Sequence, residues 1–253
     1  MTATDDLKQM FDEAVTRINV PSFAMSDPVQ FPRRFKNLPD IEIASLLCST
    51  IAWGNRKMIC NNCDRLLHVM HDTPLEYTMS GDYEALDDAM NLHRTFFARD
   101  LKYMLRGLRD IYSHYPTLND FAADHKVGDS AAPAWQLASL LQQQWHKANG
   151  TGNPRCLPSR IECTALKRLN MALRWLVRND GIVDMGVWNA IKPSQLYIPL
   201  DVHVADTART LSLITRRSND RKTVEELTAV LRQMCPEDPV KYDYALFGIG
   251  MGL

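Results

Sequence analysis

The stretch Ile41-Glu-Ile-Ala-Ser-Leu-Leu-Cys-Ser-Thr-Ile-Ala-Trp53 decides the fold class of this chain. It is almost wholly apolar, and it is longer than a typical strand of about five or six residues. A continuous apolar run of this length predicts a buried helix. Asp40 stands at its start and Gly54 at its end, both residue types that favour helix boundaries.

Helical periodicity extends outward from this stretch over nearly the whole chain. Leu7, Phe11, Ala14 and Ile18 recur at intervals of three and four. Further helices are predicted over 92–114, 117–124, 132–147, 162–178, 202–212, 222–234 and 239–248, with Thr117 as a cap. Only residues 195–200 read as extended, and one such run makes no sheet. We therefore predict an all-α fold.

The chain has 253 residues and a formal net charge of -1. This length fits one large domain or two small ones. We predict a central helical domain over 37–195 and a second helical domain formed by 1–36 plus 196–253. Basic residues gather in 155–178 and 209–222, so that a nearly neutral chain can still offer a polyanion a local positive face.

The first residues lack the basic and apolar regions of a secretory signal, and no apolar run approaches the roughly 20 residues of a membrane span. We expect a cytoplasmic protein that does not enter a membrane, with six reduced cysteines. Cys60-Asn-Asn-Cys63, followed by His68 and His71, raises the alternative of a zinc site. The pair falls within an amphipathic helical pattern without a second such motif, so we favour coincidence on a helix and expect no metal or cofactor.

Leu200-Asp201-Val202-His203-Val204 places a carboxylate where a helix should begin. As an N-cap, Asp201 would contribute about 1 kcal/mol by accepting backbone N–H bonds. The same bonds would favour its ionised form, which suits the support of a cation. His203 is either a local hydrogen-bonding residue or a donor to a phosphate.

The predicted helix 162–178 carries Lys167, Arg174 and Arg178 on one stripe at 100° per residue. The stripe is either an ordinary solvated face or a face for phosphates. Lys167 would become a nucleophile if desolvation or neighbouring cations such as Arg168 lowered its pKa.

The segment Ile198-Pro-Leu-Asp-Val-His-Val-Ala-Asp-Thr-Ala-Arg-Thr-Leu-Ser-Leu213 resembles the active-site segment of the helix-hairpin-helix DNA glycosylases of the endonuclease III and 8-oxoguanine glycosylase types. The resemblance implies two helical subdomains with a cleft between them. It also implies that Asp201 is the catalytic carboxylate and that Lys167, in Thr164-Ala-Leu-Lys-Arg-Leu169, is the nucleophile. The turn at Asn55 and Arg56 resembles the one that approaches the lesion, and 247–250 resembles the closing helix of the 8-oxoguanine group.

A second resemblance spans about residue 35 to the end. The segments 167–178, 193–196 and 237–248, with the region of Trp188, look like a bacterial family of unassigned function. This likeness indicates kinship and says nothing of activity.

The chain also departs from the glycosylase pattern. Leu157-Pro-Ser-Arg-Ile-Glu-Cys-Thr164 lacks the glycines of the hairpin. Lys167 and Asp201 are further apart in sequence than in endonuclease III types, so the insert 179–193 would have to loop out. No four-cysteine cluster follows Asp201, and no iron–sulfur cluster is expected.

The glycosylase resemblance implies base excision from double-stranded DNA that carries a damaged base, an oxidised purine above all, or an abasic site. The damaged nucleotide would be flipped into a pocket, attacked by Lys167 and supported by Asp201. One alternative is a non-catalytic nucleic-acid-binding protein that keeps the fold, and another is an unrelated hydrolase or small-ligand enzyme. The expected DNA-binding residues are Asn55, Arg56, Arg168, Arg174, Arg178 and His203, and the base-stacking candidates are Trp53 and Trp188.

Overall fold

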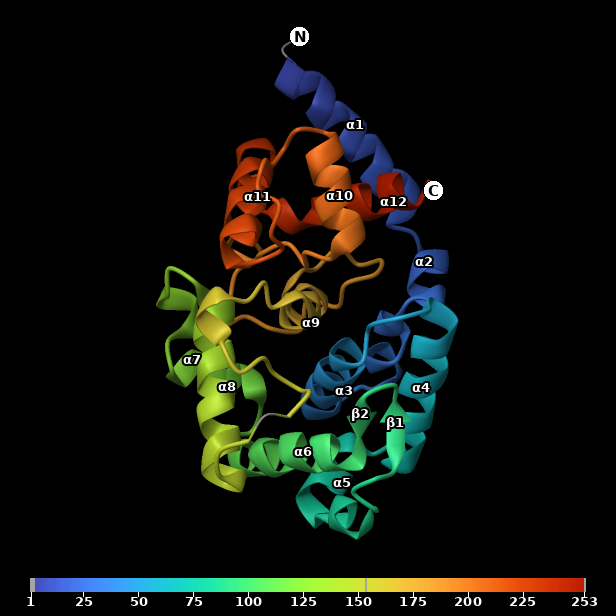
Figure 1. Cartoon of the computed structure of the whole chain (residues 1–253), viewed down its shortest axis with the longest axis vertical. Coiled ribbons are helices and arrows are strands. Elements are labelled where there is room, and N and C mark those ends of the chain that lie inside the picture. The colour runs from blue at the N-terminus through green and yellow to red at the C-terminus, as the bar shows by residue number, and fades with distance from the viewer. Residues whose placement is uncertain (1–2, 153, 253) are drawn as a thin grey trace.

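The computed structural model describes residues 3–152 and 154–252, and helices dominate this part of the chain, as predicted (Figure 1). The α-helices are α1 (Ala3–Ile18), α2 (Pro21–Ser26), α3 (Leu38–Thr50), α4 (Arg56–Val69), α5 (Pro74–Ser80), α6 (Ala98–Tyr112), α7 (Leu118–Asp124), α8 (Pro133–Asn149), α9 (Lys167–Val177), α10 (Val202–Thr210), α11 (Arg221–Met234) and α12 (Asp243–Met251). The short 3-10 helices are η1 (Pro28–Gln30), η2 (Pro32–Arg34), η3 (Asp82–Ala85), η4 (Val127–Asp129), η5 (Ile161–Cys163), η6 (Pro193–Gln195) and η7 (Pro239–Tyr242). None of the described helices has the length and apolar character that crossing a membrane requires.

The buried helix predicted from Ile41 onward is confirmed as α3. Its residues from Asp40 to Thr50 are all buried, on every side of the helix. It begins at Leu38 rather than Asp40, because the Asn37 side chain accepts the Asp40 N–H at 2.8 Å and acts as the cap. The helix packs against α5 and α9, which makes it the centre of the lower half of the molecule in Figure 1.

Two predicted helices begin later than expected. Residues 92–97 do not continue a helix: they contribute to the antiparallel hairpin of β1 (Asn91–His93) and β2 (Phe96–Phe97), whose turn places Arg94 at a left-handed φ of 51°. Helix α6 then starts after Phe97, whose N–H is accepted by Asp100 at 2.9 Å. Helix α9 starts only at Lys167, because Leu166 also takes a left-handed φ, of 49°.

The helices gather in two groups around α9. Helices α1, α10, α11 and α12 lie together at the end of the molecule that carries both termini, and α3 to α8 lie at the other end (Figure 1). Helix α12 packs on α1 and α10, and α9 packs on α3 and α8.

The insert 179–193 leaves the helical pattern as an irregular segment, as expected, and it packs back onto the protein. Val183 and Ile191 are buried. The insert also donates backbone hydrogen bonds to the end of α9, from Met185 N to Trp175 O and from Trp188 N to Leu176 O, both at 2.8 Å. It therefore covers the C-terminal end of α9 and satisfies carbonyl groups that the helix leaves open.

Candidate active site

A cavity of about 1260 Å³ opens where several helices begin. The first turns of α4, α9, α10 and α12 reach it, together with the segment after α3. The predicted site residues on its lining are Trp53, Asn55, Arg56, Lys167, Arg168, Arg174, Asp201 and His203. The cavity thus brings together residues that are far apart in the sequence.

Lys167 is the first residue of α9, and its half-buried side chain lines the cavity. Its Nζ donates a hydrogen bond to Ala52 O at 3.3 Å. Desolvation lowers the pKa of Lys167, although the carboxylates of Asp201, Asp243 and Asp27 oppose the shift. A lysine with a lowered pKa supplies neutral amine, the nucleophilic form, nearer to neutral pH than a surface lysine does.

Asp201 is the N-cap of α10, as predicted. Its Oδ1 accepts the Val204 N–H at 2.9 Å, and Pro199 and Leu200 precede it on the cavity lining. The Asp201 carboxylate also lies within electrostatic range of Lys167, whose ammonium form it favours. The structure therefore places the two residues of the predicted catalytic pair at one cavity.

Asp243, which the sequence reasoning missed, is a third ionisable group at this cavity. It is the first residue of α12, is 7% exposed and is paired with Arg174. Burial raises the pKa of Asp243 to about 6, and the nearby Asp201 adds to the rise, while Arg174 and Lys167 oppose it. The helix was predicted over 239–248, which placed Asp243 inside it, so the helix-start signal that drew attention to Asp201 was absent here.

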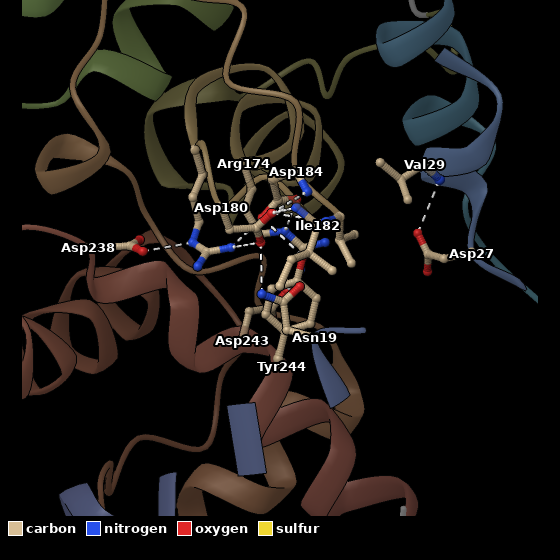
Figure 2. A network of polar contacts seen from close by, with 12 residues as sticks. Asn19, Asp27, Val29, Arg174, Asp180, Ile182, Asp184, Asp238, Asp243 and Tyr244 are labelled. Atoms are coloured by element: carbon tan, nitrogen blue, oxygen red, sulfur yellow. Dashed lines mark hydrogen bonds and ion pairs between the residues drawn. The ribbon is translucent and has the colours of Figure 1, made fainter. Parts of the chain in front are cut away.

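Arg174 and Arg178 are not free to hold phosphates, so this prediction is wrong. Each is 5% exposed, and both guanidinium groups pair with carboxylates from the insert and the C-terminal region. Figure 2 labels Arg174 and these carboxylates. Arg174 Nε donates to Asp184 Oδ1 at 3.2 Å, and Arg174 Nη1 donates to Asp243. Arg178 donates to Asp238 Oδ2 and to Asp184 Oδ2, each at 2.8 Å, and also to Asp180. Arg174 and Arg178 do lie on one face of α9, but the groups that pair with them are carboxylates of the protein itself.

The two tryptophan candidates lie in different surroundings. Trp53 lines the cavity, and the Arg168 guanidinium carbon lies 4.2 Å from the centroid of its ring system. Trp188 is 5% exposed, lies away from the cavity lining and donates from Nε1 to Glu42 Oε1 at 2.8 Å. Trp188 is a core residue, so its predicted stacking role is wrong.

Asn55, Arg56 and His203 form the outer part of the lining. Asn55 is exposed and caps α4 by accepting the Lys57 N–H at 3.0 Å. Arg56 lies over the rings of Phe23 and Phe247, 5.4 and 5.1 Å from their centroids. His203 is exposed at the start of α10. We call these three residues the cavity rim.

The region of the expected hairpin is a long segment between α8 and α9, within which η5 forms a single turn. Gln142 donates to Pro158 O at 3.1 Å, and Asp100 accepts the Arg155 N–H at 3.0 Å, so side chains anchor the segment to α8 and α6. Cys60 and Cys63 lie on α4, as the helical pattern predicted. Across the described ranges, no group of three or more His, Cys, Asp or Glu residues has the arrangement of a metal site.

A family model described as a protein of unknown function, DUF2400, matches residues 27–252. Since the match covers most of the chain, the chain belongs to this family. No curated protein and no solved structure matches the chain.

Proposed function

We propose that this member of the DUF2400 family is a base-excision DNA glycosylase with a lysine-dependent abasic-site lyase activity. The observation that carries the proposal is that Lys167 and Asp201 line one cavity within electrostatic range of each other. A nucleophilic amine and a carboxylate that supports positive charge are the two groups that this chemistry needs.

The reaction begins with a damaged nucleotide flipped out of the duplex, because its glycosidic bond is otherwise unreachable. Lys167 Nζ forms a bond to C1′ of the sugar, and the bond from C1′ to the base breaks. The electron pair leaves with the base, which takes up a proton. Opening of the sugar at C1′–O4′, with a proton taken up by O4′, leaves a Schiff base on Lys167. Loss of a proton from C2′ then expels the 3′ phosphate.

Asp201 stabilises the positive charge that develops on the sugar as the glycosidic bond breaks. Its position as a helix cap fixes the carboxylate before the substrate arrives, so no reorganisation is needed during the reaction. Arg56, Arg168 and His203 would contact phosphates, and Trp53 would stack on the extruded base. The preference for an oxidised purine rests on the resemblance to the 8-oxoguanine group.

The proposal includes a helix-hairpin-helix glycosylase-like arrangement of two subdomains, 37–195 and 1–36 plus 196–253. Residues 1, 2, 153 and 253 of these ranges lie outside the described residues. Two observations support this arrangement. Helices α1 and α10 to α12 lie at one end of the molecule and α3 to α8 at the other, and residues of both groups line the cavity. The proposal keeps the cytoplasmic location expected from the sequence.

The test is covalent trapping on duplexes that carry an oxidised purine or an abasic site, with borohydride added to reduce the Schiff base. We expect an adduct with the wild-type protein, none with Lys167→Gln, and an undiminished adduct with the exposed control Lys192→Gln. Asp201→Asn should slow base release by about 10²-fold. DNA binding without adduct, base release or strand cleavage would refute the enzymatic proposal.

The second candidate function is nucleic-acid binding without catalysis. It is favoured by the hydrogen bond from Val204 N to Asp201, which accounts for the carboxylate as a helix cap alone. In this case Asp201→Asn leaves the salt-dependent affinity for duplex DNA unchanged and no lesion yields an adduct. Absence of any nucleic-acid binding at low salt would instead favour an unrelated hydrolase or small-ligand enzyme.

A further inference from the structure

Lys167, Asp201 and Asp243 all stand where helices begin. Lys167 is the first residue of α9, Asp201 caps α10 and Asp243 is the first residue of α12. Helices α10 and α12 pack against each other, and all three side chains reach the same cavity. Helix N-termini carry partial positive charge, which favours carboxylates and disfavours an ammonium group.

Asp243 is held in place by its ion pair with Arg174. Asp184 of the insert binds Arg174 Nε at 3.2 Å, and Tyr244 lies under the guanidinium group, 4.6 Å from ring centroid to Cζ. Tyr244 in turn donates to Asp184 Oδ2 at 3.0 Å. This network, drawn in Figure 2, holds the buried Asp243 carboxylate, which lines the cavity.

The charged groups that act on this centre come from several elements. Asp27, just before η1, Asp201 and Asp243 favour the ammonium form of Lys167, and Arg168 opposes it. Asp243 is acted on by Arg174, Asp201 and Lys167. Burial shifts the pKa of Lys167 down and that of Asp243 up to about 6, so the two pKa values approach each other. Moving a proton between these two groups therefore costs less than between an exposed lysine and an exposed aspartate.

We propose that Asp243 is the proton carrier of the Lys167 centre. Asp243 accepts a proton from the Lys167 ammonium, directly or through one water, which leaves a neutral amine and a carboxylic acid. The amine attacks C1′, the glycosidic electron pair passes to the base, and Asp243 returns its proton to the base nitrogen. Asp201, held as the cap of α10, stabilises the sugar cation. This inference rests on the proposed glycosylase function, within which it gives Asp243 a role separate from that of Asp201.

The first experiment follows the reactivity of Lys167 without DNA. The protein is treated with propionaldehyde and cyanoborohydride from pH 5 to pH 10, and alkylation of the peptide that contains Lys167 is measured by mass spectrometry. The alkylation rate of the wild-type protein should rise with pH, and this rise should flatten near pH 6. Asp243 ionises there, and its negative charge stabilises the ammonium form of Lys167. In Asp243→Asn the flattening should disappear. The midpoint of the alkylation profile should fall by about one pH unit, because the variant lacks the carboxylate that favours the ammonium form of Lys167.

The second experiment measures single-turnover base release and borohydride trapping over the same pH range. Asp243→Asn should lower the rate of base release at pH 7 by about 10²-fold, although its Lys167 is more easily deprotonated. Asp238→Asn is the matched control: Asp238 pairs with Arg178 and lies away from the cavity lining, so both its alkylation profile and its rate should equal those of the wild-type protein.

Two results overturn the inference. One is an alkylation profile of the wild-type protein without flattening near pH 6, which needs no variant and so holds even if Asp243→Asn fails to fold. The other is a rate loss in Asp243→Asn that is the same at every pH, which a merely structural role would produce. A wild-type protein that releases no base refutes the proposed function instead, and the alkylation profiles still decide whether the ionisation of Asp243 is coupled to that of Lys167.

Discussion

Glu42 is a buried carboxylate whose replacement by glutamine makes stability depend on pH in a calculable way. It is 0% exposed on α3 and accepts four hydrogen bonds. Tyr112 Oη and Leu118 N donate to Oε2 at 3.0 and 2.8 Å, and Asn119 N and Trp188 Nε1 donate to Oε1 at 2.9 and 2.8 Å. The carboxylate thereby joins α3 to α6, to the start of α7 and to the insert.

Burial raises the pKa of Glu42 from 4.5 to about 7, against the opposing effect of the four donors. Since the folded state favours the protonated form, the stabilisation is complete below pH 4.5 and is lost as the pH rises through 7. From pH 5 to pH 8 this loss amounts to about 2–3 kcal/mol. Glu42→Gln does not titrate, but its amide group faces a backbone N–H and leaves one donor unsatisfied, which costs about 1–3 kcal/mol at every pH.

The free energies of unfolding of both proteins should therefore converge as the pH rises. Glu42→Gln should be less stable than the wild-type protein at pH 5 and about equally stable at pH 8, as measured by urea denaturation followed by circular dichroism. The exposed control Glu237→Gln should keep a constant difference from the wild-type protein. A constant difference for Glu42→Gln would refute the reasoning, because it would mean that the four donors keep Glu42 ionised at both pH values.

Three further substitutions test other parts of the structure. Arg174→Met should lower the free energy of unfolding by about 3–5 kcal/mol in urea denaturation, because it leaves Asp243 buried without its cationic partner and removes one of the two arginines that pair with Asp184. A loss below 1 kcal/mol would contradict this. Gly107→Ala should destabilise the protein by about 1–3 kcal/mol in thermal unfolding, since the added Cβ would lie 1.6 Å from Trp145 Cδ1, and an unchanged melting temperature would contradict that contact. Trp53→Ala should weaken duplex binding about tenfold in fluorescence anisotropy while Trp53→Phe retains most of it, and equal losses in both variants would argue against stacking.

The all-α fold was predictable because helical periodicity is a local property. The buried helix α3, the Thr117 cap of α7 and the Asp201 cap of α10 all follow from residues within one or two turns of each other. The late start of α9 was not predictable in this way. It depends on a left-handed conformation at Leu166, a residue type that rarely adopts it, which only the surrounding packing can impose.

Part of the candidate site was also predictable from local sequence patterns. Lys167 and Asp201 were recognisable because each sits in a distinctive local segment. The partners of Arg174 were not, because the ion pair with Asp243 joins α9 to α12 across the fold. A cationic stripe looks the same in sequence whether phosphates or internal carboxylates face it, and the charge pattern of one helix cannot distinguish the two.

The charges of the cavity differ between its rim and its interior. The rim carries Arg56 and His203, whereas Lys167 faces the carboxylates of Asp27, Asp201 and Asp243. A phosphate beside Lys167 would meet the carboxylates of Asp27 and Asp201 and the ion-paired carboxylate of Asp243, but at the rim it would meet the guanidinium group of Arg56. The cavity therefore suits a substrate whose anionic groups stay outside while a neutral part reaches the amine. A nucleotide flipped from a duplex has this form, because its phosphates remain in the strand while its sugar and base turn inward.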